Sequence, residues 1–373
     1  MIPIAKPFIG AEEQAAVADV LASGILASGP RVREFERAFA EYCQSAAGAV
    51  ACTSGTAGLC TTVAALELPA GSKILTTPFS FIATANCILY GGYLPVFVDV
   101  DPTTFMITAD QVREALDDDP AIRALILVHL YGQACEIHEI VEIAHARGVV
   151  VIEDCAQAHG AEEFDVPVGG IGDLGVFSFY PTKNMMTGEG GMITGSNPTL
   201  IDRCRLFIDH GAPVRYHHTS LGFNYRMTSM AAAIGLCQLQ RLPAWNAQRR
   251  KNARALTAAF TGISWLTTPF ERPQCTHVYH QYVLKVQDRA RFQAHMDAAG
   301  VGTAVHYPRT ILDQPYYQQQ GFSSASCPTA RRLADEVISL PVHPAVSAQD
   351  LQTIITAVQT FVPAEDALTV AAR

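Results

Sequence analysis

The fold is decided by the stretch Gly175-Val-Phe-Ser-Phe-Tyr-Pro-Thr-Lys-Asn-Met-Met-Thr-Gly-Glu-Gly-Gly-Met-Ile-Thr194. An apolar, aromatic run ends at a Pro-Thr-Lys step, a glycine-rich turn follows at 188–191, and a second apolar run comes after it. This order predicts a strand, a break that carries Lys183, a turn and another strand. Lys183 is therefore expected at the end of a strand and not on a solvated helix face.

A lysine in this position has a specific chemical use. Partial removal from water lowers the pKa of its amine, and a neutral amine attacks carbonyl groups to form a Schiff base. The carbonyl cofactor that this chemistry indicates is pyridoxal phosphate (PLP), which also needs an acid for its pyridinium nitrogen, a cradle for its phosphate and a flat surface for its ring. The alternative is that Lys183 is an ordinary surface charge.

The acid is supplied by the segment Gly148-Val-Val-Val-Ile-Glu-Asp-Cys-Ala-Gln-Ala-His-Gly160. Its β-branched run predicts a strand buried on both faces, along which Glu153 and Asp154 point to opposite sides. Asp154 then lies at the carboxyl end of a parallel strand, where open α/β sheets bind ligands, and can form a charge-assisted hydrogen bond with a pyridinium nitrogen. The alternative is that Asp154 caps a following helix.

The phosphate cradle is predicted upstream, where residues 49–66 have the pattern of a strand, a tight turn and a helix of small residues. Thr56 and Ala57 open this helix, whose free N–H groups and positive dipole end attract a dianion. Gly55 allows the backbone to approach the ligand closely. The alternative is that Ser54-Gly-Thr56 is only a helix cap.

An aromatic platform for the ring is predicted where the strand Lys73–Thr77 breaks at a proline before a helix. Phe79 and Phe81 are both candidates, and Phe81 is the preferred one. The alternative is that both rings belong to the core, which is the usual place of an aromatic beside an apolar run.

The whole chain has an α/β pattern. Short apolar runs separated by helix-like stretches predict a mainly parallel sheet with helices on both faces. A large domain is expected over residues 1–243 and a smaller α+β domain over 244–373, with the boundary near Pro243–Arg250. The expected strands of the large domain lie near 48–52, 73–77, 94–98, 122–130, 149–153, 174–179 and 191–194. Further expected elements are a helix over Thr228–Leu242, strands over Tyr279–Val286 and Gly302–His306, helices over 288–299, 328–338 and 347–361, and a tail over Pro363–Arg373.

Composition excludes several classes of protein. The 373 residues carry a net charge of −9 and no basic tract, which argues against a nucleic-acid binder. The ten cysteines show no pair at metal or redox spacing, so reduced thiols are expected. His277-Val-Tyr-His280 and His217-His218 could suggest a metal site, but no cysteine or carboxylate cluster accompanies them, so no metal is expected. We find neither a signal peptide pattern nor a membrane-spanning run, and a cytoplasmic enzyme is expected.

Taken together in this order, the segments resemble the DegT/StrS family of PLP-dependent sugar aminotransferases, which are fold type I enzymes. The resemblance covers about nine-tenths of the chain. The motifs that carry it are Ser54-Gly-Thr56, Thr77-Pro-Phe-Ser-Phe-Ile-Ala-Thr84, Pro95-Val-Phe-Val-Asp-Val-Asp101, His129-Leu-Tyr-Gly-Gln133, Ile152-Glu-Asp-Cys-Ala-Gln-Ala-His-Gly160, Phe177-Ser-Phe-Tyr-Pro-Thr-Lys183, Gly188-Glu-Gly-Gly191, Gly222-Phe-Asn-Tyr-Arg-Met227, Val305-His-Tyr-Pro308 and Leu340-Pro-Val-His-Pro344.

The resemblance implies a seven-stranded sheet in the large domain and a role for each matching residue. Lys183 would form the Schiff base, Asp154 would face the pyridinium nitrogen, and Phe81 would stack on the ring. Gln157 would lie near the 3′-hydroxyl, and Gly55, Thr56, Ala57 and Ser178 would surround the phosphate. Asn224 would reach the cofactor of a second subunit, so that a homodimer shares its active sites. His306, Tyr307 and Arg309 would border the sugar, although the alternative is that their loop only packs the domains together.

The function implied is transfer of an amino group, by way of the pyridoxamine phosphate form of the cofactor, from an amino acid to a keto sugar. The donor is expected to be glutamate and the acceptor a nucleotide-linked 3- or 4-keto-(deoxy)hexose. Three alternatives stay open: transfer to a cyclitol such as a keto-inositol, a PLP-dependent dehydratase or isomerase, and a regulatory protein that keeps the fold without the activity. Retention of Lys183 argues against the dehydratase.

Overall fold

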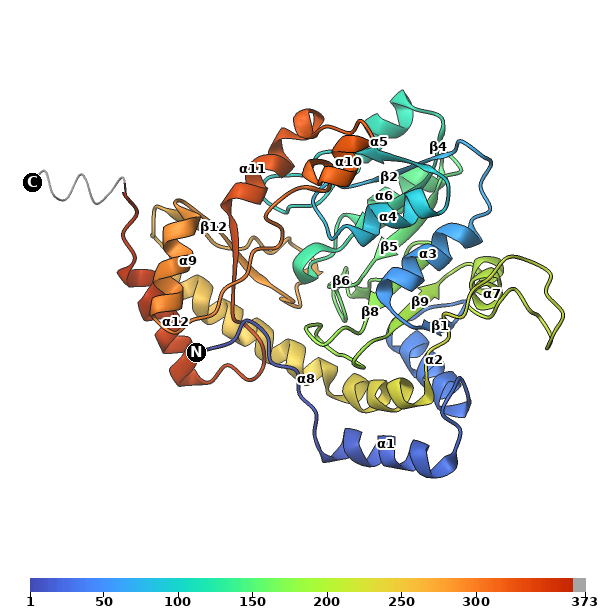
Figure 1. Cartoon of the computed structure of the whole chain (residues 1–373). Coiled ribbons are helices and arrows are strands. Elements are labelled where there is room, and N and C mark those ends of the chain that lie inside the picture. The colour runs from blue at the N-terminus through green and yellow to red at the C-terminus, as the bar shows by residue number, and fades with distance from the viewer. Residues whose placement is uncertain (365–373) are drawn as a thin grey trace, which may run out of the picture.

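A computed structural model describes residues 1–364 of the chain, and a seven-stranded sheet forms its centre (Figure 1). The strand order is β1-β9-β8-β5-β4-β2-β3, and all neighbouring strands are parallel except where β9 pairs with β1 and β8. The predicted fold class is confirmed, and every strand predicted for the large domain is present. The strands are β1 Ala49–Cys52, β2 Lys73–Thr76, β3 Leu94–Phe97, β4 Ile122–Val128, β5 Val150–Asp154, β8 Leu174–Ser178 and β9 Gly191–Gly195.

Helices cover both faces of this sheet, which explains why its strands are apolar on both sides. Successive residues of β5 show the alternation: Val151 packs among the residues of α5 and α6, whereas Ile152 packs among those of α3, α4 and α7. The helices of this part are α1 Ala11–Ser23, α2 Pro30–Tyr42, α3 Gly55–Ala65, α4 Ala83–Tyr90, α5 Ala109–Asp118, α6 Ile137–His145 and α7 Pro198–Phe207.

The long helix α8, Ser229–Phe260, differs from the prediction of a helix over Thr228–Leu242. It has 32 residues and passes through Pro243 (yellow in Figure 1). Its first half packs against α1 and α2, while its second half enters the core of the C-terminal part. The expected boundary near Pro243–Arg250 therefore falls inside a continuous helix, and the division at residue 243 stays a proposal.

The C-terminal part is an α+β unit around a three-stranded sheet of order β10-β12-β13. Two expectations are wrong here. Gly302–His306 is not a strand, because only Ala304 bridges to Ser339, and the helix expected to reach 338 ends at Glu336, before β13. The elements are β10 Leu266–Thr267, β12 Tyr282–Val286, β13 Val337–Leu340, α9 Arg289–Ala298, α10 Pro315–Gln319, α11 Pro328–Glu336 and α12 Ala348–Thr360.

Two further features connect the parts. A small sheet joins β11 Cys275–Thr276, β6 Glu162–Glu163 and β7 Val166–Pro167. The N-terminal segment, expected within the large domain, bridges from Ile2 to Val301 and packs on the C-terminal core. Of the expected tail over Pro363–Arg373, residues 365–373 lie outside the described residues.

Candidate active site

The carboxyl ends of β1, β2, β5 and β8 meet at one edge of the sheet, and a cavity of about 580 Å³ opens there. Open α/β sheets bind ligands at this edge because the loops leaving parallel strands converge on it. Most of the residues predicted from the sequence line this cavity: Gly55, Thr56, Phe81, Asp154, Gln157, Ser178, Lys183, His306 and Tyr307.

Lys183 enters the cavity from the turn that follows β8. The turn is closed by a hydrogen bond from the Lys183 backbone N–H to the Tyr180 carbonyl oxygen at 2.9 Å. Burial lowers the pKa of the Lys183 amine to about 8, while the nearby Asp154 carboxylate acts in the opposite direction. The amine is therefore neutral more often at neutral pH than a solvated lysine is, as a nucleophile requires.

Asp154 ends β5 and is buried at the cavity wall. Its Oδ2 accepts a hydrogen bond from Thr84 Oγ1 at 2.8 Å, and its Oδ1 accepts one from the Ala156 N–H at 3.1 Å. Burial raises the pKa of this carboxyl, and these two donors and Lys183 oppose the rise. Residues 155–161 form turns and no helix, so the helix-cap alternative for Asp154 is wrong.

Glu153 points to the opposite side of the sheet, as the alternation predicts. One carboxylate oxygen accepts from the Gly169 N–H at 2.8 Å and the other from the Ile171 and Gly172 N–H groups at 3.0 and 2.7 Å. His129 Nε2 lies 2.9 Å from the first oxygen. Glu153 therefore holds the backbone of residues 169–172 by hydrogen bonds, whereas Asp154 faces the cavity.

The start of α3 forms the end of the cavity nearest β1. The Ser54 side chain caps this helix by accepting a hydrogen bond from the Ala57 N–H at 3.1 Å. That N–H therefore already has a partner. A Cβ at Gly55 would lie 2.8 Å from Ser178 Cβ, so only glycine lets the helix start approach the end of β8 this closely. A helix N-terminus beside a serine hydroxyl suits a phosphate dianion.

Burial distinguishes the two candidate aromatics. Phe79 is fully buried in the core, whereas Phe81 is 55% exposed and lines the cavity with its ring centroid 6.2 Å from that of Tyr307. Gln157 joins this wall by accepting the Tyr131 N–H at 2.8 Å and donating to Tyr307 Oη at 3.0 Å. Phe81, Gln157 and Asp154 all line this one cavity.

The arrangement fits PLP on its own geometry. A partly buried lysine, a buried carboxylate, an aromatic wall and a helix start that a Cβ would obstruct surround one space. Each of the cofactor's chemical needs has a matching group in this cavity.

A sequence model of the DegT/DnrJ/EryC1/StrS aminotransferase family matches residues 7–359. The chain belongs to this family. The predicted resemblance and activity class are confirmed: the protein is an aminotransferase, and the family is PLP-dependent.

Relatives and solved structures of the family extend this result. The chain is 35% identical to the spore coat polysaccharide biosynthesis protein SpsC of Bacillus subtilis, with 98% of each sequence covered. It is 36% identical to UDP-N-acetyl-3-dehydro-alpha-D-glucosamine 3-aminotransferase of Acidithiobacillus ferrooxidans, with 83% of each covered. S. venezuelae DesV superposes with a TM-score of 0.90 at 31% identity over 94% of each chain. The PMP-form of putative sugar aminotransferase Spr1654 from Streptococcus pneumoniae gives 0.90 at 25% identity, covering 96% of this chain and 98% of that one.

Three predicted residues do not line the cavity. Ala57 is buried behind the helix start, Asn224 is exposed on the segment that pairs with Asp209, and Arg309 is exposed beyond the His-Tyr-Pro loop. The role of Asn224 at the cofactor of a second subunit stays a prediction. Arg309 makes no contact with the cavity of its own chain.

Sequence reasoning missed several cavity residues. Thr84 lies one helical turn after Phe81, and the spacing could have placed it near the same wall. His280 and Gln281 come from the C-terminal part, and Ile4 and Ala5 from the N-terminal segment. No local pattern links these segments to β5 or β8, since only the tertiary fold brings them to the cavity.

One buried group among residues 1–364 has the residue types of a metal site, namely His129, Glu153 and Cys155. The histidine and the carboxylate of this group are already hydrogen-bonded. His129 Nδ1 accepts the Cys135 N–H at 3.1 Å, so the ring hydrogen is on Nε2, where it is donated to Glu153. With Glu153 also holding backbone N–H groups, the cluster is a hydrogen-bonded support for β5.

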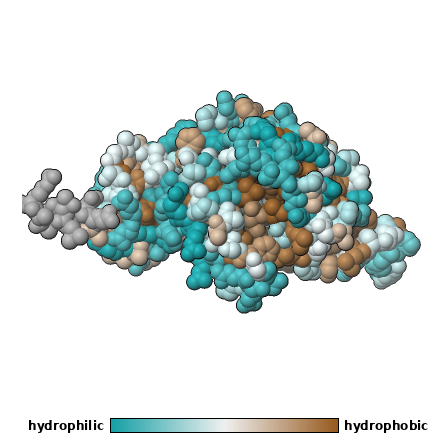
Figure 2. All heavy atoms as spheres, turned by 90° about the horizontal axis from the view of Figure 1, so that it is seen from above, coloured by the Kyte–Doolittle hydropathy of each residue, from teal (hydrophilic) through white to brown (hydrophobic). Residues whose placement is uncertain are grey.

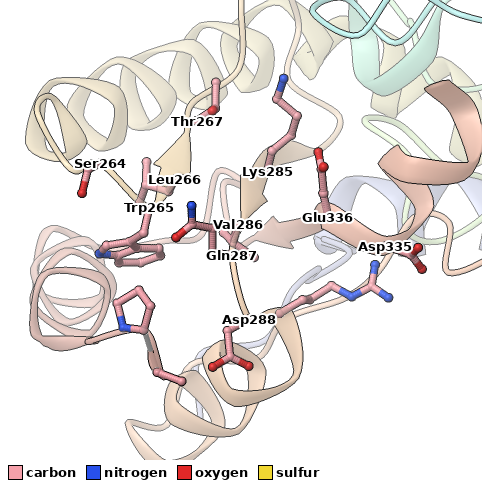
Figure 3. Close-up of a pocket in the computed structure, with 13 residues that line it drawn as sticks. Ser264, Trp265, Leu266, Thr267, Lys285, Val286, Gln287, Asp288, Asp335 and Glu336 are labelled. Atoms are coloured by element: carbon pink, nitrogen blue, oxygen red, sulfur yellow. The ribbon is translucent and has the colours of Figure 1, made fainter. Parts of the chain in front are cut away.

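A separate cavity of about 760 Å³ lies in the C-terminal part and is shown in Figure 3. Trp265, Lys285, Asp288 and Glu336 are among its lining residues, and none of the predicted site residues belongs to it. Among residues 1–364, no helix combines the length and apolarity that crossing a membrane demands.

Proposed function

We propose that this aminotransferase transfers the amino group of glutamate to a nucleotide-linked keto sugar, with PLP held in the cavity around Lys183. The observation that carries the cofactor site is that the Lys183 amine, whose pKa burial lowers, shares one cavity with the buried Asp154 carboxylate. The substrate class is supported by the relatives, one of which carries the name of an aminotransferase for a UDP-linked 3-keto sugar.

The residues divide the work by position. PLP, when bound, supplies the carbonyl carbon that holds the amino group and an electron sink next to it. Asp154 would keep the ring nitrogen protonated, and Thr84 would hold the Asp154 carboxylate in place. The Lys183 Nζ atom would accept the proton from the amino-bearing carbon and later return it, as a general base and then a general acid. The α3 start and Ser178 would hold the phosphate.

The covalent role of Lys183 is tested by reconstitution with PLP. Lys183→Ala and Lys183→Arg should both lack turnover and the visible absorbance of covalently held PLP, since neither side chain supplies a neutral primary amine. Lys251→Ala, at an exposed position of α8, is the control and should behave as wild type. Wild-type turnover by Lys183→Ala would disprove the assignment.

The substrates are tested by separate half-reactions. Glutamate should convert the PLP form to the pyridoxamine form, and a UDP- or dTDP-linked keto sugar should convert it back. A protein that binds PLP but never exchanges an amino group with any donor would contradict the proposed activity.

We also propose a homodimer that shares its active sites in the cytoplasm. Large exposed hydrophobic residues support an interface, and Figure 2 shows hydrophobic residues gathered near the middle of one face. The large hydrophobic residues that are exposed in this chain include Leu21, Ile25, Leu26, Tyr90, Val214, Tyr216 and Leu221. Mixing Lys183→Ala with Asn224→Ala protein should restore part of the turnover lost in each. All ten cysteines are free, which agrees with a reducing compartment.

A further inference from the structure

A chain of hydrogen bonds behind Lys183 leads from α8 to the cavity wall. Asn246 donates through Nδ2 to the His159 carbonyl oxygen at 2.8 Å, and its Oδ1 accepts from Asn184 Nδ2 at 2.9 Å. Asn184, the residue after Lys183, also donates to the Val278 carbonyl oxygen at 3.2 Å. Both asparagine side chains are buried.

The two backbone carbonyls set the direction of this chain, because a carbonyl oxygen can only accept. Each amide must turn its nitrogen toward its carbonyl, which leaves Asn184 Oδ1 facing His280 Nδ1 at 3.3 Å. An oxygen at that place accepts, so the His280 ring carries its hydrogen on Nδ1 and a lone pair on Nε2. The buried amides thus select one tautomer of His280.

His280 is also kept neutral. Burial, followed by the positive charges of Lys183 and Arg249, holds the pKa of the His280 ring well below its usual range. Arg249 lies close because Nη1 donates to the carbonyl oxygens of Tyr279 and His280, at 3.1 and 3.3 Å. The ring therefore offers a neutral acceptor at Nε2.

This acceptor is at the cavity. His280 is 5% exposed, and both His280 and its neighbour Gln281 line the cavity that holds Lys183. Among residues 1–364, the contact made by His280 Nε2 is with Gln281 Nε2 at 3.4 Å, and the Gln281 side chain itself lines the cavity. A bound molecule with a better donor can replace it.

We propose that His280 Nε2 accepts a hydrogen bond from a hydroxyl group of the keto-sugar acceptor, and that Asn184 is the positioning residue that fixes the required tautomer. The proposal rests on the function proposed above and adds a residue that recognises the keto sugar. A sugar hydroxyl can donate to this lone pair. The carboxylates of an amino donor only accept, and its amino nitrogen is the atom that is transferred to the cofactor. The pair therefore acts in the sugar half-reaction and not in the donor half-reaction.

The tautomer is tested on the PLP-loaded enzyme by nitrogen NMR with ¹⁵N-labelled histidine. The signal lost in His280→Asn identifies the residue. We expect a neutral ring protonated at Nδ1 around neutral pH, and we expect Asn184→Asp to shift it toward the doubly protonated form, because a carboxylate beside Nδ1 stabilises the cation. A wild-type ring protonated at Nε2 would overturn the proposal.

The hydroxyl contact is tested by half-reactions of the same variant. In His280→Asn the amide nitrogen takes the place of Nδ1, so the link to Asn184 is kept while the Nε2 acceptor is removed. With UDP-N-acetyl-3-dehydro-α-D-glucosamine as probe, the KM for the sugar should rise by about tenfold, as expected for one lost hydrogen bond. The KM and rate with glutamate should stay within about twofold of wild type.

Analogues of the probe that each lack one hydroxyl sharpen the test. The analogue that lacks the hydroxyl bound by His280 should bind wild type about tenfold more weakly than the probe does. His280→Asn should bind this analogue as weakly as wild type does, because the hydrogen bond is already absent. His280→Phe, which keeps the ring shape, is the second variant if His280→Asn does not hold PLP, and His145→Asn is the surface control. The proposal would be overturned if His280→Asn impaired the glutamate and sugar half-reactions equally, or if it left the KM for the sugar unchanged. A wild type active with glutamate but with no keto sugar would instead refute the proposed function.

Discussion

Gly55 at the start of α3 and Ser178 at the end of β8 are in direct contact, with no room for a Cβ between them. Gly55→Ala would place the new carbon 2.8 Å from Ser178 Cβ and force the helix start away from the cavity. Overpacking of this kind costs about 1–3 kcal/mol, so PLP affinity should fall by about tenfold or more. Titration of the apoenzyme with PLP measures this affinity, and Cys60→Ala on the same helix is the control. Unchanged affinity would show that α3 does not hold the phosphate.

Thr84→Val removes the hydroxyl that donates to Asp154 Oδ2 while keeping the shape of the side chain. A hydrogen bond to a charged group contributes about 1.5–3 kcal/mol, so kcat should fall by about tenfold or more in both half-reactions. Thr61→Val is a matched control, since its buried hydroxyl only bonds the Ala57 carbonyl oxygen of its own helix. A Thr84→Val enzyme as fast as this control would mean that Asp154 needs no support from Thr84.

Covalent attachment of PLP to the apoenzyme should depend on pH through Lys183. The reactive form is the neutral amine, whose fraction grows as pH rises through the Lys183 pKa of about 8. The attachment rate should therefore rise with pH and level off above that value. In Asp154→Asn the negative charge that raises the Lys183 pKa is gone, so the midpoint should move to lower pH. Stopped-flow absorbance measures both profiles, and a midpoint near 10.5 in wild type would contradict the burial of this amine.

Glu153→Gln should change stability more than catalysis. The amide keeps one acceptor oxygen, whereas the carboxylate accepts backbone N–H groups on both of its oxygens. A buried N–H left without a partner costs about 1–3 kcal/mol, so urea unfolding should occur at clearly lower denaturant concentration. Glu114→Gln on the exposed face of α5 is the control. A loss of kcat without a loss of stability would place Glu153 in the reaction itself.

The sheet and the positions of Asp154 and Lys183 could be predicted because their signals are local. A β-branched run followed by Glu153 and Asp154 fixes a buried strand, its end and the direction of each acid. Parallel strands then place Asp154 and Lys183 at one edge without further information. The contacts of Thr84 with Asp154 and of Asn184 with His280 join distant segments, so no spacing in the sequence reveals them.

Two of the wrong predictions have clear physical causes. Pro243 was expected to end a helix, since an interior proline costs about 3 kcal/mol. Residues of α8 on both sides of it are buried in large cores, among them Leu242 and Leu256, and this packing outweighs the cost. Gly302–His306 has β-branched residues, but its chain leaves the sheet after Ala304 to bring His306 to the cavity.

The continuity of α8 has a consequence for protein engineering. Swapping C-terminal halves among relatives at residue 243 would join two sequences in the middle of α8. The helix before this junction packs in the core of the large sheet, and the helix after it packs in the C-terminal core. Crossover points before Ser229 or after Phe260 keep the helix whole and carry it as one unit. Chimeras designed to exchange substrate preference should recombine there.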